Sequence, residues 1–402
     1  MAKVLLGDVV DRVKDKVDKD ATDLEYYVGG EHIDGDEIMV HQKGLIQGST
    51  IGPAFHMRFQ RGDVLLMSRN PHLRKASMVD FDGICSDVSY ICRTKDNDVL
   101  LQSLLPFILQ TPEFWQFAEE NKKGGLPFFL NWKDFARFEF ELQTIERQRQ
   151  IADLLWAMER VKTAYRELIA RTDDLVKSQF IEMFGNLDIS ESRWPVATME
   201  DVFSITSSRR ILKSEWKDSG DIPFIRVRDM VQLANKEPLT NEFYVTEDFY
   251  NSRPEEEKVK PGDIIVSATS TIGKTYIIKP GERFYFKDAD VLLFRKKIPI
   301  NGVFFAYGLT MPTVWHQIED GLGTTTVAHF LISKACKLRQ PLPPIDLQEQ
   351  FAAFVRQSDK SKFAGVNRNL SRCSGIQSIT RWDGKSDNYS SLYRMTVQLA
   401  TV

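Results

Sequence analysis

The stretch that most closely matches a catalytic motif runs from Ala268 to Thr275. Its letters ATSTIGKT fit the phosphate-binding loop of nucleotide hydrolases, except that Ala268 replaces the first glycine. Such a loop works between a strand and a helix, because the amides at the helix N-terminus bind the phosphates. Here Tyr-Ile-Ile-Lys and a Pro280-Gly281 turn follow, which predicts a second strand instead. We therefore expect a strand–loop–strand segment whose tip offers hydroxyls and a lysine to phosphates and base edges.

Nothing else in the sequence forms a catalytic pattern. The four cysteines, Cys85, Cys92, Cys336 and Cys373, lack the close spacing of a zinc site, and the six histidines form neither a metal nor a triad pattern. There is no Asn/Asp-Pro-Pro-aromatic methyltransferase motif and no glycine-rich cofactor loop. We predict no catalytic site, no metal, no directly bound cofactor, and reduced thiols.

Composition sets the class of protein. The 402 residues carry a net charge of -3, with ordinary hydrophobic and charged fractions. A chain that coats nucleic acid usually has a large positive excess, so any nucleic-acid contact here must depend on local clusters of basic residues. The first residues lack the apolar run of a signal peptide, and no window approaches the roughly 20 apolar residues of a membrane span. We expect a cytoplasmic protein without membrane contact.

An internal repeat organises the chain. Three pairs of segments match when their numbers are shifted by 200: Arg61-Gly-Asp-Val-Leu65 with Pro261-Gly-Asp-Ile-Ile265, Thr111-Pro-x-x-Trp115 with Met311-Pro-x-x-Trp315, and Leu142–Ala152 with Leu342–Ala352. Each copy places β-like runs first and a helix afterwards. The sequence therefore predicts an α+β protein with a pseudo-twofold internal repeat and a β-rich core in each copy.

A long helix follows the first copy. From Ile145 to about Phe184 there is no proline or glycine, and Gly185-Asn186 is a termination signal. Residues at alternating spacings of four and three form a mostly apolar seam: Leu154, Met158, Val161, Tyr165, Leu168, Thr172, Leu175 and Gln179. At 1.5 Å per residue such a helix is about 60 Å long. It is either a solvated linker or, as we favour, one strand of a coiled coil.

In this order, these motifs resemble the specificity subunit of type I restriction–modification systems over about residues 1 to 365. The resemblance rests on Leu342-Pro-Pro-Ile345-x-x-Gln348 opening a helix, on its less typical first copy, on the Gly-Asp-Ile-Ile-Val run before the Thr-Ile-Gly-Lys loop, and on the long helix. It implies two target recognition domains at 1–140 and 187–340, a coiled-coil spacer at 141–186 and the start of a second helix at 341–364.

The resemblance also implies a function. Each domain would bind one half of a split site in double-stranded DNA, and the helices would set the spacing and dock two modification (methyltransferase) subunits. Catalysis would belong to partners: the modification subunits use S-adenosylmethionine, and the restriction subunits use ATP and Mg²⁺. The alternatives are a stand-alone DNA-modifying or nucleotide-hydrolysing enzyme, which the missing motifs disfavour, and a purely structural coiled-coil scaffold.

Base recognition favours Arg, Lys, Asn, Gln, Ser and Thr on exposed loops. For each residue the simpler alternative is a solvated surface side chain, and the 69–75 and 269–274 loops are the better candidates. The first-domain candidates are Lys43, Arg69, Asn70, His72, Arg74 and Lys75, and those of the second are Ser207, Ser208, Arg209, Arg210, Arg226, Arg228, Thr269, Ser270, Thr271 and Lys274. Subunit contacts are assigned to Leu154, Met158, Val161, Tyr165, Leu168 and Leu175. We expect Trp115 and Trp315 to be core residues rather than stacking platforms.

The sequence departs from the family pattern near its end. The second helix begins well at Ile345, but after Ala364 the apolar spacing is lost and Ser, Gly and polar residues dominate 365–402. Such an ending is typical of a frameshifted reading frame or of a disordered tail. If the helix is shortened, the seam of the first helix lacks part of its partner.

Overall fold

The computed structural model describes residues 2–235, 237, 239, 242–322 and 328–376, and in the last helix the side chains as far as Ser361. The described chain divides into two compact units, residues 2–165 and 166–376, which we call the first and second modules. Each contains its own buried apolar clusters and is described by itself below. Within the described residues no helix is both long enough and apolar enough to cross a membrane.

The first module contains three sheets and four short helices. Two four-stranded sheets have the orders β2-β9-β6-β7 and β4-β3-β8-β5, and β1 pairs with β10. The strands are β1 (Ala2–Leu5), β2 (Val10–Val13), β3 (Tyr26–Val28), β4 (Gly44–Leu45), β5 (Phe55–Phe59), β6 (Val64–Met67), β7 (Ala76–Met78), β8 (Gly83–Ser86), β9 (Ser89–Thr94) and β10 (Glu139–Leu142). The helices are α1 (Leu6–Val9), α2 (Leu105–Leu109), α3 (Pro112–Glu120) and α4 (Trp132–Phe135).

The second module repeats this plan. Its sheets have the orders β12-β18-β15-β16 and β14-β13-β17, and β11 pairs with β19. The strands are β11 (Val196–Thr198), β12 (Phe203–Thr206), β13 (Ile222–Ile225), β14 (Tyr244–Val245), β15 (Ile264–Ser267), β16 (Thr275–Ile277), β17 (Tyr285–Phe286), β18 (Val291–Lys296) and β19 (Arg339–Pro341). The shorter helices are α6 (Met199–Val202), α7 (Val227–Ala234), α8 (Glu247–Asn251), α9 (Gly302–Gly308), α10 (Pro312–Leu322) and α11 (Ile332–Lys337).

The repeated Gly-Asp pair has a structural role in both modules. Gly62 and Gly262 have φ of 89° and 87°, a backbone conformation that favours glycine. Asp63, only 2% exposed, accepts a hydrogen bond from the backbone of residue 60 and pairs with Arg93 at 2.7 Å. Asp263 likewise accepts a hydrogen bond from the backbone amide of residue 260 and forms an ion pair of 2.7 Å with an arginine on β18. The repeat therefore preserves a turn and a buried ion pair at the base of each central hairpin.

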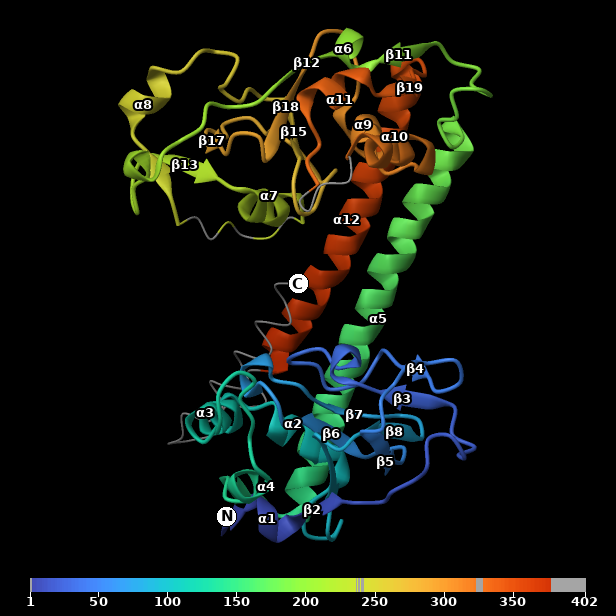
Figure 1. Cartoon of the computed structure of the whole chain (residues 1–402), viewed down its shortest axis with the longest axis vertical. Helices are drawn as coiled ribbons and strands as arrows, with labels where there is room; N and C mark the ends of the chain where they lie inside the picture. The colour runs from blue at the N-terminus through green and yellow to red at the C-terminus, as the bar shows by residue number, and fades with distance from the viewer. Residues whose placement is uncertain (1, 236, 238, 240–241, 323–327, 377–402) are drawn as a thin grey trace. The chain divides into compact units, whose positions relative to one another are not determined.

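The long helix α5 (Ile145–Phe184) is continuous, as predicted, and ends at Gly185 with φ of 71° (Figure 1). Near its start, Gln148 is 1% exposed and its side chain bonds the backbone of Val99 and Leu101. In the second module the repeat partner Gln348, on α12 (Ile345–Ile376), bonds the backbone of Asn301. The shared glutamine therefore joins each long helix to its own module.

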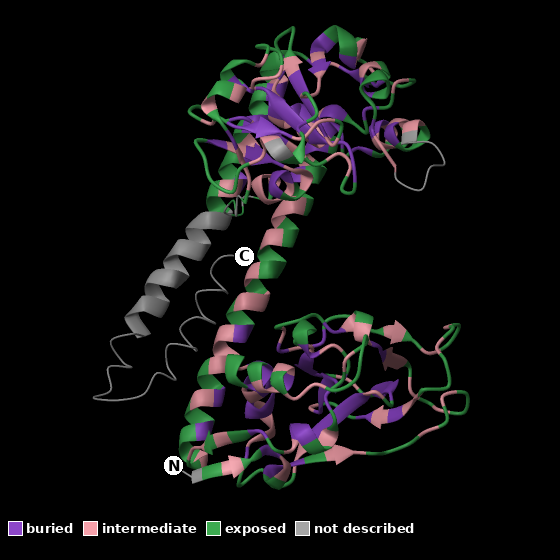
Figure 2. Cartoon of the chain, turned by 60° about the vertical axis from the view of Figure 1, so that its left-hand side comes forward, coloured by how far each residue is buried: buried purple, intermediate pink, exposed green. Residues whose placement is uncertain are grey.

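The buried face of α5 differs from the predicted seam. Leu154, Val161, Leu168 and Leu175 are 42%, 47%, 48% and 54% exposed, and the predicted positions between them are partly buried. Figure 2 shows exposed and intermediate positions along much of this helix. In the second module the helix instead buries Val176, Phe180 and Phe184. The reason is aromatic packing: these phenylalanines contact Phe351 of α12 and Phe304 of α9.

The second long helix continues farther than the sequence pattern indicates. The backbone of α12 is helical to Ile376, beyond Ala364, where the apolar spacing ends. No proline follows Pro344, so nothing in the sequence forces the helix to stop at residue 364. The expected tail at 365–402 lies outside the described residues from 377 onward.

Candidate nucleic-acid interface

The glycine-lysine loop of the second module connects two antiparallel strands. β15 pairs with β16, with Val266 opposite Thr275, so the strand–loop–strand prediction is confirmed and no helix follows the loop. Ser267 fixes the loop: its hydroxyl donates to the carbonyl of Thr271 and accepts from the backbone amide of Lys274 at 3.0 Å. The tip is therefore ordered, with Ser270, Thr271 and Lys274 exposed.

A tryptophan supports this tip from behind. Gly273 has φ of 83°, and a Cβ built on it would lie 2.7 Å from Cζ3 of Trp315, on α10. The Trp315 indole is partly buried, and its Nε1 donates to Glu319 at 2.8 Å. Trp115 of the first module is 2% exposed and lies in the core. Trp115 is thus the core residue expected, whereas Trp315 supports the loop from a half-buried position.

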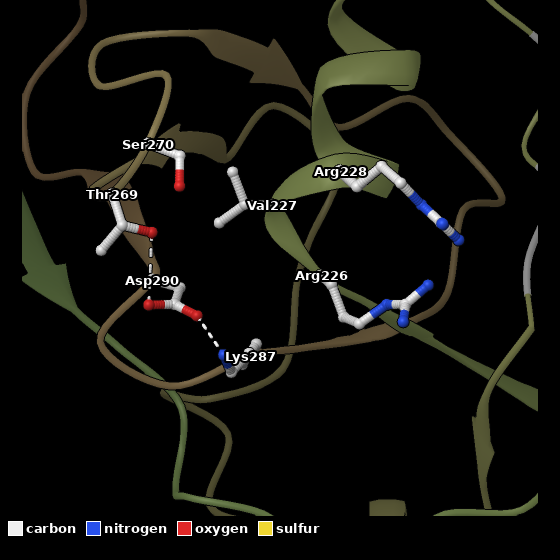
Figure 3. A pocket seen from close by; sticks show the side chains of 7 residues that line it. All are labelled: Arg226, Val227, Arg228, Thr269, Ser270, Lys287 and Asp290. Carbon is white, nitrogen blue, oxygen red and sulfur yellow. Dashed lines mark hydrogen bonds and ion pairs between the residues drawn. The ribbon is translucent and has the colours of Figure 1, made fainter. Parts of the chain in front are cut away.

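A pocket of about 210 Å³ forms beside the loop (Figure 3). It is lined from three segments: the start of α7, the loop after β15 and the turn before β18. Its lining residues are Arg226, Val227, Arg228, Thr269, Ser270, Lys287 and Asp290. Four of these were predicted from the sequence, and the fold brings them to one place although they lie about 40 positions apart in the chain.

Carboxylates neutralise much of the positive charge of this pocket. Glu242 accepts from Arg226 at 3.1 Å and from Arg228 at 3.0 Å. The hydrogen bonds from Arg226 and Arg228 lower the pKa of Glu242, so its carboxylate stays ionised to a lower pH than that of an ordinary glutamate. Lys287 pairs with Asp290, which also accepts a hydrogen bond from Thr269 at 3.3 Å. The pocket therefore offers both donors and acceptors, a mixture suited to base edges as well as phosphates.

The remaining second-module candidates lie before β13. The hydroxyls of Ser207 and Ser208 donate to the carbonyls of Val291 and Phe286, so both help to hold the backbone in place. Arg209 pairs with Glu215, and Arg210 is exposed. None of these residues lines the pocket.

In the first module the corresponding loop lies between β6 and β7, in the same place in the sheet. It contains a single 3-10 turn, Pro71–Leu73, flanked by Asn70 and Arg74 with φ of 53° and 50°. Arg74 pairs with Asp36 at 3.4 Å. The loop therefore presents a compact turn rather than the extended tip of the second module.

The other candidates of the first module have mixed environments. Lys75 is half-buried and donates to the carbonyl of Gly30 at 2.6 Å, whereas Arg69 and His72 are exposed. Lys43 lies over the ring of Tyr26, with its Nζ 3.5 Å from the centroid. Lys75 is thus a structural contact as well as a candidate.

Sequence reasoning missed three contributors to these loops. Lys287 and Asp290 complete the pocket, and their -Lys-Asp-Ala-Asp- segment carries no recognisable motif. Gln110, 3% exposed, accepts from the Trp115 indole at 3.0 Å and donates to the carbonyl of Ala76 at 2.7 Å. A glutamine just before Thr111, ahead of the repeated Pro-x-x-Trp segment, was the available signal for this support.

The comparisons with known proteins agree with this architecture. Residues 191–370 match the family model described as the type I restriction modification DNA specificity domain. This part of the chain is therefore similar to the DNA specificity domain of type I restriction–modification systems. Over these residues the resemblance seen in the sequence is confirmed.

Two relatives extend the comparison. A curated Haemophilus influenzae protein, named for the specificity subunit of a type I restriction enzyme, is 26% identical over 161 residues, which is 40% of this chain and 39% of that protein. The crystal structure of the type I restriction–modification S subunit from M. genitalium aligns over 94% of each chain, at 14% identity and a TM-score of 0.54. The chain therefore shares the fold of that S subunit, and the predicted fold class is confirmed.

Proposed function

We propose that the chain is the DNA-recognition subunit of a type I restriction–modification complex, with each module binding one half of a bipartite site. One observation carries this proposal: the two modules share the order of their central four-stranded sheet but present different loops at the same hairpin position. The scaffold is repeated, whereas the exposed chemistry differs between a basic turn at 69–75 and a hydroxyl-rich tip at 269–274. Two copies of one scaffold with two different tips suit the recognition of two different half-sites.

In the second module, the pocket and the adjoining loop tip, which carries Lys274, provide the contacts. Arg226, Arg228 and Lys274 can donate to phosphates or to guanine acceptors. The exposed Ser270 and the half-buried Asp290 add a hydroxyl and a carboxylate that can accept from the amino group of a base, whereas Thr269 is 5% exposed and its hydroxyl holds Asp290 in place. We assign methyl transfer with S-adenosylmethionine and translocation with ATP and Mg²⁺ to partner subunits, as the family resemblance implies.

The helix α5 supplies the surface proposed for the modification subunits. Its four exposed leucine and valine side chains, at Leu154, Val161, Leu168 and Leu175, recur every seven residues and therefore lie along one side of the helix. Met158 and Tyr165, which complete the predicted contact set, lie beside this line and are partly buried. A regular apolar stripe on a helix is the kind of surface that a partner helix covers.

The deciding experiment is the methylome of a host that lacks other DNA methylation and expresses this chain with its modification subunits. A new split motif, with two short half-sites separated by a fixed gap, is the expected result. A matched pair of variants, Thr271→Ala in the second module and Arg69→Ala in the first, should each alter only its own half-site. Absence of any new motif, with the modification subunits active alongside another specificity chain, contradicts the proposal, as does methyl transfer by the purified chain alone.

A further inference from the structure

A second loop lies against the proposed DNA-binding turn of the first module. It joins α3 to α4 and forms a narrow hairpin, in which Lys123 and Phe129 exchange backbone hydrogen bonds of 2.8 and 3.0 Å. The returning arm then bonds the turn itself. The Asn70 amide donates to the carbonyl of Phe128 at 2.7 Å, and the Leu130 amide donates to the carbonyl of Ser68 at 2.8 Å. The hairpin 122–130 and the turn 68–75 are therefore one connected surface.

The tip of this hairpin is apolar and fully presented to solvent. Leu126 is 87% exposed, whereas no other exposed large apolar side chain among the described residues exceeds 57%. Gly124, Gly125 and Pro127 flank it and are exposed as well, so the tip is slender. Gly124 has φ of 81°, and a Cβ there would lie 2.8 Å from the ring of Phe129, so glycine is needed for the tight turn.

Basic residues accompany the apolar tip. Lys122 pairs with Glu119 at 2.7 Å and covers the ring of Phe128. Lys123, by contrast, is exposed and has no ion pair among the described residues, as is also the case for Arg69 on the adjoining turn. Positive side chains beside an exposed leucine are complementary to a polyanion with apolar base surfaces, namely duplex DNA.

We propose that the hairpin 122–130 is a wedge that inserts Leu126 at a base step next to the first half-site, while Lys123 and Arg69 contact the flanking phosphates. This inference rests on the proposed function. It adds Leu126, which would separate two stacked base pairs, to the residues of the turn that would recognise the half-site. Leucine and proline are among the side chains that proteins insert between base pairs. Since the tip is held by backbone bonds to the turn, its insertion is coupled to the docking of that turn.

The test uses the chain assembled with its modification subunits and a duplex carrying the motif found in the methylome experiment. Leu126→Ala should weaken binding about tenfold, because apolar contact is lost, and should leave the dependence of affinity on salt unchanged. Lys123→Ala should weaken binding and reduce the salt slope by about one, because one phosphate contact is lost. Leu5→Ala, a 41% exposed leucine on β1, is the matched control and should change neither quantity.

Insertion of Leu126 between base pairs can be detected separately from affinity, through the fluorescence of a base analogue. With 2-aminopurine placed in turn at each position next to the first half-site, the wild-type complex should show raised fluorescence at one step, and Leu126→Ala should abolish it. Unchanged affinity of Leu126→Ala, or lost affinity without an unstacked step in the wild type, overturns the wedge while leaving the proposed function intact. Failure of the wild-type complex to bind the motif would instead count against the proposed function. Because Leu126 is so exposed, the variant should fold like the wild type.

Discussion

Replacing Gly273 by alanine tests whether Trp315 supports the recognition loop of the second module. The matched control is Gly262→Ala. Both glycines have positive φ, 83° and 87°, so both alanines must adopt the left-handed conformation. At Gly262 a Cβ would meet no atom within 4 Å, whereas at Gly273 it would lie 2.7 Å from the Trp315 ring. The two variants therefore share the backbone strain and differ in the clash.

The expected magnitudes follow from these two terms. Left-handed strain for an L-residue costs roughly 1–2 kcal/mol in the free energy of unfolding, and Gly262→Ala should lose about that much. Gly273→Ala should lower the free energy of unfolding by about 1–3 kcal/mol more, because the Trp315 indole must move against the side chains that it packs on. The movement of the indole would also shift the tip that carries Thr271 and Lys274. Methylation of the second half-site should therefore fall by a larger factor than the loss of folding stability alone would cause.

The assay is urea unfolding of the full chain followed by circular dichroism, together with methylation of the second half-site in the assembled complex. A double-mutant cycle with Trp315→Ala isolates the clash, because the extra cost of Gly273→Ala should disappear when the ring is absent. Equal losses for Gly273→Ala and Gly262→Ala, or additive effects in the cycle, would refute the supporting role of Trp315.

Three further outcomes are expected. Glu242→Gln should strengthen DNA binding about 3- to 10-fold, because it removes one of the two carboxylates that neutralise Arg226 and Arg228 and leaves only their pairing with the buried Asp229; weaker binding in a titration would show that the carboxylate itself contacts DNA. The isolated chain should self-associate through the α5 stripe, and Leu168→Lys with Leu175→Lys should make it monomeric in sedimentation without lowering its melting temperature. A monomeric wild-type chain would argue against an adhesive stripe. Burial raises the pKa of the Cys85 thiol to about 12, so iodoacetamide at pH 8 should alkylate the half-buried Cys336 before Cys85, and mass spectrometry would show the order of these two.

The sequence revealed the scaffold more fully than the surface. The repeated Gly-Asp and Gln148/Gln348 positions could be recognised in the sequence. They make the same backbone contacts in both modules, so the same residue types occur in both copies. The 40-residue helix was visible because nothing interrupts it between Ile145 and Phe184. Its buried face was not, because aromatic partners on α9 and α12, far away in the sequence, select the Phe180 side over the regular stripe.

The candidate site could be predicted only in part. Arginine, threonine and serine candidates at 226–228 and 269–270 converge on one pocket, and their residue types were sufficient to suggest them. Lys287 and Asp290 needed the fold, since only strand pairing brings their turn beside the loop after β15. Leu126 was missed for a different reason: an isolated leucine between glycines and a proline shows no periodicity, and only its exposure distinguishes it.

The hydrogen bonds of Ser267 have a thermodynamic consequence. A loop that orders only when its ligand arrives loses conformational entropy at that moment, and its affinity falls accordingly. Here one buried hydroxyl fixes the backbone of Thr271 and Lys274 through bonds within the loop itself. Under the proposed function, the second half-site should therefore be bound with a small entropic penalty and by a nearly rigid surface, and mismatched bases should be rejected because the loop cannot adapt to them.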